Sequence, residues 1–79
     1  MHMSKFEKLK QKIKDGKSIS YEEAETILIK LGFMMRSNGS HHVFSKVGYE
    51  KNISIKRRTE LLPYQVRLVE EAVQCYEEI

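Results

Sequence analysis

Residues 38–44 read Asn-Gly-Ser-His-His-Val-Phe, and they are the most informative part of the sequence for the fold. Its first two residues are the strongest two-residue signal for a β-hairpin turn. With Gly48 marking a second turn, residues 33–56 predict three short antiparallel strands. Ile53 and Ile55 alternate with polar residues in the third strand, which indicates a sheet covered on one face only.

Helical patterns stand on both sides of this sheet segment. Ser4 with Glu7, and again Ser20 with Glu23, has the spacing of a capping box, so two helices are expected before the strands. Pro63 suits the first turn of a last helix after them. The predicted fold class is therefore α+β: a two-layer sandwich in the order helix, helix, three-stranded antiparallel sheet, helix, with one sheet face open.

Length and composition predict one small folded domain over residues 1–79. The chain has 41% hydrophobic and 32% charged residues, which is typical of folded proteins of this size. Residues 1–3 look like a cloning remnant. Cys75 has no second cysteine to pair with, which favours a reducing, cytoplasmic location. No apolar run approaches the roughly 20 residues that span a bilayer, so no membrane partner is expected.

The charge pattern points to a polyanionic partner. The formal net charge is +3 and the isoelectric point is about 9.1. Basic residues gather between residues 33 and 58, where Glu50 is the single acidic residue. The C-terminal segment, in contrast, is rich in glutamate. The lysines of the first helix are interpreted as a solvated face. The mid-chain basic residues are Arg36, Lys46, Lys51, Lys56, Arg57 and Arg58.

The two adjacent histidines must point to opposite faces of a regular strand. Phe44 is bulkier than Val43 and is the better core residue, which places His42 with it on the covered face. His41 is therefore expected on the open face, in the same region as the basic residues. From the residue pattern alone, such a pair is more often a surface histidine beside a half-buried one than a catalytic site.

An exposed imidazole among cations suits cleavage of RNA by its own 2′-hydroxyl. Histidine titrates near neutrality and can accept or donate the proton, while cations stabilise charge on the phosphate. Neither a metal nor another cofactor is expected, since adjacent strand residues diverge and no paired ligand spacing occurs. A second acid-base group would be Tyr49, a lysine or water. The predicted catalytic residue is His41, and the predicted RNA-binding residues are Gly39, Ser40, Arg36, Lys56, Arg57 and Arg58.

The chain also resembles the HicA toxins of bacterial toxin-antitoxin pairs, the YcfA-like messenger-RNA interferases. The resemblance rests on Leu31-Gly32-Phe33, on residues 39–44, and on Pro63-Tyr64-Gln65-Val66. It implies a fold similar to double-stranded-RNA-binding domains, metal-independent cleavage of messenger RNA, and neutralisation by a HicB-like antitoxin. Because the smallest relatives begin close to the helix that precedes the hairpin, the resemblance also makes residues 4–18 an N-terminal helical extension. The catalytic histidine of the family follows Gly-Ser directly, which corresponds to His41 here.

Two functions remain open at this point. One is an endoribonuclease toxin that needs His41, is a monomer when free, and is covered by an acidic surface of its antitoxin. The other is a catalytically silent RNA-binding module that uses the same open sheet face. Tyr64, Gln65 and Arg67, at the start of the last helix, are interpreted as helix-surface residues.

Overall fold

The structure is a computed structural model that describes residues 4–56 and 60–76, apart from the side chain of Asn38. Its elements follow the predicted order, and the α+β class is confirmed. The helices are α1 (Lys5–Lys14), α2 (Tyr21–Lys30) and α3 (Pro63–Tyr76), and the strands are β1 (Met34–Asn38), β2 (His41–Lys46) and β3 (Tyr49–Lys56).

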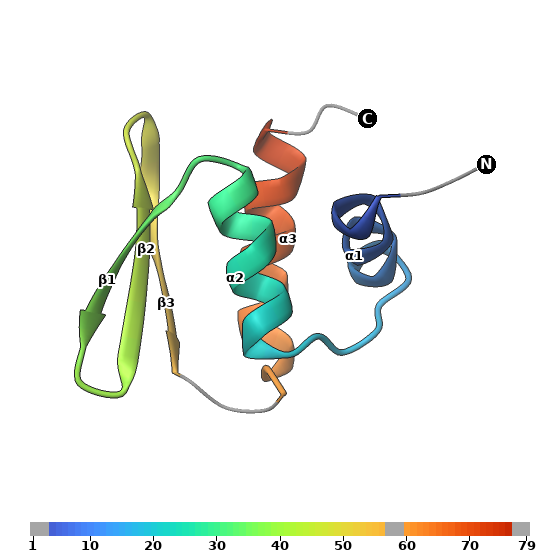
Figure 1. Cartoon of the computed structure of the whole chain (residues 1–79), viewed down its shortest axis with the longest axis horizontal. Coiled ribbons are helices and arrows are strands. Elements are labelled where there is room, and N and C mark those ends of the chain that lie inside the picture. Colours follow the sequence, from blue (N-terminus) through green and yellow to red (C-terminus); the bar gives the residue numbers. More distant parts are fainter. Residues whose placement is uncertain (1–3, 57–59, 77–79) are drawn as a thin grey trace.

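The three strands form one antiparallel sheet in the order β1-β2-β3. Helices α2 and α3 lie side by side against one face of the sheet, and the other face is open (Figure 1). These are the two predicted layers. Helix α1 packs on α2 and α3 and lies on the side of this helix pair away from the sheet. The N-terminal helix therefore adds an outer layer, while the likeness to a double-stranded-RNA-binding domain stays a prediction.

Both predicted capping boxes are present, and they fix where α1 and α2 begin. At α2, the backbone N–H of Glu23 donates to the Ser20 hydroxyl at 3.2 Å, and the Ser20 N–H donates to the Glu23 carboxylate at 2.9 Å. Each reciprocal pair satisfies two backbone donors that the first helical turn cannot satisfy. The start of α2 matters for the site because its first residue, Tyr21, reaches the sheet.

The core lies between the sheet and the helix pair. Phe44 of β2 is completely buried, and its neighbours on β3, Ile53 and Ile55, are at most 1% exposed. Ile27 and Val69 close this core from α2 and α3. Complete burial of each of these side chains contributes about 1.5–3 kcal/mol to the stability of the fold. The covered face of β2 and β3 therefore holds the sheet to the helices.

The start of α3 differs from the prediction at one residue. Gln65 was expected on the helix surface, but its side chain is only 3% exposed. Its amide oxygen accepts a hydrogen bond from the backbone N–H of Leu62 at 2.9 Å. The side chain folds back to satisfy a donor that precedes the helix, and this explains its burial. None of the helices in the described residues combines the length and the apolar composition needed to cross a membrane.

Candidate functional site

The β1–β2 turn presents His41 at the end of the sheet. Asn38 pairs with His41, so the two loop residues are Gly39 and Ser40, one position later than the Asn-Gly pair suggested. Gly39 has a φ of 65°, and no residue other than glycine has a positive φ among the described residues. Glycine at the first of two loop positions is the pattern of a type II′ turn. His41 is thus the first residue of β2.

The strand register brings His41 and the predicted cations onto one face. His41 lies opposite Asn38 of β1 and Lys56 of β3, and residues opposite each other on antiparallel strands share a face at about 5 Å between Cβ atoms. Arg36 occupies the next row of the same face, opposite Val43. His41, Arg36 and Lys56 are all exposed. The open face therefore carries an imidazole between two basic side chains.

His42 points to the covered face, as the alternation predicts. Its Nδ1 is hydrogen-bonded to the hydroxyl of Tyr21, and the two rings meet edge to face at 5.0 Å between centroids. Tyr21 is only 4% exposed. This contact ties β2 to the first turn of α2 directly behind His41. The sequence gives no signal for it, because Tyr21 lies 21 residues away and reaches His42 only through the tertiary fold.

The cations of the open face are available to an anion. Within residues 4–56 and 60–76, neither Arg36 nor Lys56 takes part in an ion pair; the pairs recorded there join Lys12 to Glu23 and Lys51 to Glu71. Arg57 and Arg58, which follow β3 directly, lie outside the described residues. Ser40 is exposed in the turn beside His41, and Gly39 gives the turn its positive φ.

Tyr49 does not belong to this site, which excludes it as the second acid-base group. It begins β3, seven residues from Lys56, which is about 23 Å along an extended strand. Its ring packs against Phe33 and Tyr76 at centroid distances of 5.3 and 5.7 Å. Burial, and then the charge of Glu71, raise the pKa of the Tyr49 hydroxyl. The second acid-base group was predicted to be Tyr49, a lysine or water, and Lys56 is the lysine that lies opposite His41.

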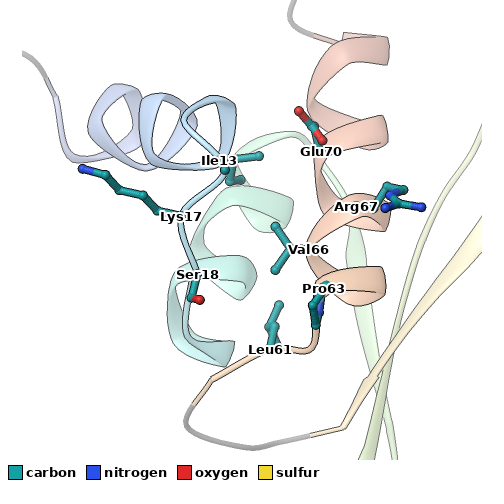
Figure 2. Close-up of a pocket in the computed structure, with 9 residues that line it drawn as sticks. Ile13, Lys17, Ser18, Leu61, Pro63, Val66, Arg67 and Glu70 are labelled. Carbon is teal, nitrogen blue, oxygen red and sulfur yellow. The ribbon is translucent and has the colours of Figure 1, made fainter.

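A hollow of about 240 Å³ lies elsewhere, between α1 and the start of α3 (Figure 2). Ile13, Leu61 and Val66 line it, whereas the charged ends of Lys17 and Arg67 point away from it. This lining does not suit a phosphate. The described residues also contain no cluster of three or more His, Cys, Asp or Glu side chains placed to hold a metal ion.

The open-face arrangement has the parts that phosphate-ester chemistry needs. An imidazole can exchange a proton near neutral pH, and fixed cations can stabilise charge that develops on phosphate oxygens. Comparisons of the chain with protein-family models, with curated proteins and with solved structures found no match. The likeness to HicA toxins therefore rests on the residues of the chain alone.

Proposed function

We propose that this chain is a HicA-type endoribonuclease toxin that cleaves messenger RNA without a metal, with His41 as the general acid-base residue. The observation that carries the proposal is the position of His41. It is exposed at the first position after a tight turn, on an open sheet face that it shares with Lys56 and Arg36. The Gly-Ser-His element that leads into this position is also the one that resembles the family.

The proposed reaction needs one proton acceptor and one proton donor. A neutral imidazole nitrogen of His41 takes the proton of an RNA 2′-hydroxyl while the 2′-oxygen forms a bond to the adjacent phosphorus. The bond from phosphorus to the 5′-oxygen breaks, and this oxygen is protonated by the imidazolium, by the ammonium of Lys56 or by water. The products are a 2′,3′-cyclic phosphate and a 5′-hydroxyl. Arg36 and Lys56 stabilise the charge on the phosphate oxygens as the transition state forms.

The proposed partner is a HicB-like antitoxin that covers the open sheet face. A flat face is accessible to a long RNA, and it is equally accessible to a protein. An acidic surface on the antitoxin complements Arg36 and Lys56, which speeds association and excludes RNA from His41. The same proposal places the toxin in the cytoplasm, where messenger RNA is found, as a monomer when the antitoxin is absent.

The test compares the parent protein, His41→Ala and Ser54→Ala on a mixed-sequence RNA in excess chelator. Ser54 is a matched control because it is exposed on the same face, one row away from His41. We expect the parent and Ser54→Ala to cleave at similar rates. Loss of a positioned acid-base group should slow His41→Ala by at least about 100-fold while RNA binding is retained.

Two results would overturn the proposal. Equal cleavage by the parent and His41→Ala would show that another group, or a contaminating nuclease, performs the reaction. No cleavage by any variant, with RNA binding retained, would favour the catalytically silent RNA-binding module. Addition of a purified acidic antitoxin then tests occlusion separately, because an undiminished cleavage rate in the complex contradicts coverage of His41.

A further inference from the structure

The first helix is a second basic region of the chain, besides residues 33–58. Residues 4–17 contain six lysines against Glu7 and Asp15, a net charge of +4. The whole chain has a formal charge of +3, so the remaining residues together carry −1. That remainder includes a net charge of +5 in residues 33–58, so α1 and the loop that follows it are one of two regions that attract a polyanion at long range.

The lysines of α1 flank its buried side. Leu9 and Ile13 are at most 5% exposed and pack towards α2 and α3. One line of lysines runs beside this apolar stripe, with helical spacings of three and four residues over about 10 Å and a last member beyond the helix end. This α1 lysine row consists of Lys5, Lys8, Lys12 and Lys17.

A shallow groove follows the α1 lysine row. It has a volume of about 300 Å³ and is lined by Lys8, Gln11, Lys12, Asp15 and Lys17. Its acidic member, Asp15, accepts a hydrogen bond from the side-chain amide of Gln11 at 2.9 Å, which orients the carboxylate but leaves its charge in place beside three lysines.

The neighbouring carboxylate on α2, that of Glu23, forms an ion pair with a lysine of the row. Glu23 is bonded to the ammonium group of Lys12 at 3.1 Å. Within the part of the chain that the structure describes, Lys5, Lys8 and Lys17 are exposed and make no ion pair. The row thus offers three cations to an external anion.

We propose that the α1 lysine row binds the phosphate backbone of RNA, as a second contact separate from the His41 face. Contacts to phosphates require neither a pocket nor a base-specific group, and exposed lysines along a groove supply them. An anionic lipid surface fits less well, because the apolar side of α1 that would enter a bilayer is buried. The inference deepens the proposed function by adding a second binding surface for the same class of substrate.

The two surfaces lie on opposite sides of the molecule. Helices α2 and α3 separate α1 from the sheet (Figure 1). A short RNA that occupies the open sheet face therefore cannot reach the α1 lysine row. A long RNA can pass around the molecule and contact both surfaces. The length of the RNA becomes the variable that separates a local effect on His41 from a second contact.

The experiment measures the affinity of RNA by fluorescence anisotropy in a His41→Ala background, which keeps the RNA intact. The test variant carries Lys5→Gln, Lys8→Gln and Lys17→Gln. The matched control carries Lys30→Gln, Lys46→Gln and Lys51→Gln. It removes the same charge from positions away from both surfaces, since Lys46 lies over the Tyr76 ring and Lys51 pairs with Glu71 of α3. A third variant carries Lys5→Arg, Lys8→Arg and Lys17→Arg, which keeps the charge.

For an RNA of about 30 nucleotides, the test variant should bind about tenfold more weakly than the parent at moderate salt. The slope of log affinity against log salt should fall by about 2, because roughly 0.7 is lost per phosphate contact to a single strand. The matched control should change affinity less than about threefold, and the arginine variant should restore it. An RNA of about four nucleotides should bind all four proteins alike.

Equal losses in the test and control variants would show that net charge alone matters, and would overturn the inference. Equal losses for the short and the long RNA would overturn it too, because the lysines would then act through the fold. The inference would also be overturned if the test variant bound the long RNA as tightly as the parent, or if the parent bound no RNA. Cleavage is measured separately, so a parent that cleaves nothing but shows this length dependence contradicts the nuclease proposal and supports the second contact.

Discussion

Neighbouring residues of β2 point to opposite faces of the sheet, and the two faces differ in burial and in contacts. On the covered face, His42 packs against Tyr21 and Phe44 is completely buried. On the open face, His41 is exposed and stands opposite Lys56. The pleat thus separates, within a single strand, the side chains that hold the fold from those proposed to act on RNA. A substitution on one face should change the free energy of unfolding, and a substitution on the other should change what happens to RNA.

The largest expected effect comes from the core side of this strand. Phe44→Ala should lower the free energy of unfolding by about 3–5 kcal/mol, because it leaves a cavity between the sheet and the helix pair. Val43→Ala, one residue away and half-buried on the open face, should cost about 1 kcal/mol or less. Urea unfolding followed by circular dichroism measures both. Similar losses for the two variants would break the distinction between the faces.

A smaller effect is expected at the contact behind His41. Tyr21→Phe removes the hydroxyl that is bonded to His42 and should cost about 1 kcal/mol of stability. His42→Leu and the double variant complete a double-mutant cycle, which isolates this contact from the other interactions of Tyr21. We expect a coupling energy of at least about 0.5 kcal/mol. A coupling near zero would mean that the hydroxyl and the ring do not anchor β2 to α2.

The smallest expected effect lies away from both faces, at the start of α2. Burial disfavours the charge of Glu23, but hydrogen bonds from Ser20 and Lys12 outweigh it and lower the pKa of this carboxyl. The folded-state pKa is thus below the unfolded one, so the stabilisation is complete above pH of about 4.3 and is lost as the pH falls through the folded-state pKa.

Glu23→Gln tests that dependence. The variant should be less stable than the parent by about 1 kcal/mol or less at neutral pH, and the difference should shrink in acid. Unfolding curves from neutral pH down to about pH 3 measure it. A difference that stays constant with pH would show that the carboxyl contributes through its shape and its capping bonds, not through its charge. RNA binding at neutral pH should not change.

Patterns of local origin predicted most of the fold. Alternation along β2 was sufficient to separate His41 from His42, and the two capping boxes placed the starts of α1 and α2. The glycine-containing turn was expected at Asn38-Gly39, but the loop is Gly39-Ser40. One residue of register distinguishes the two turn types, and the same Asn-Gly-Ser sequence permits both.

Features that depend on the tertiary fold were not predictable in this way. The contact between Tyr21 and His42 joins segments that are far apart in sequence, and the exclusion of Tyr49 from the site needed the strand register. Gln65 is polar and was interpreted as a surface residue, but it is buried and accepts a hydrogen bond from the backbone N–H of Leu62. The placement of α1 on the outer side of the helices followed from no local pattern either.

This outer placement of α1 has a consequence for how the molecule can evolve. The helix is joined by a short loop, begins with its own capping box, and makes its packing contacts with α2 and α3. Its outward side can change composition without altering the strands that hold His41. If the proposed function holds, natural selection can therefore adjust what α1 binds on one side while the proposed chemistry of the His41 face on the other side is conserved.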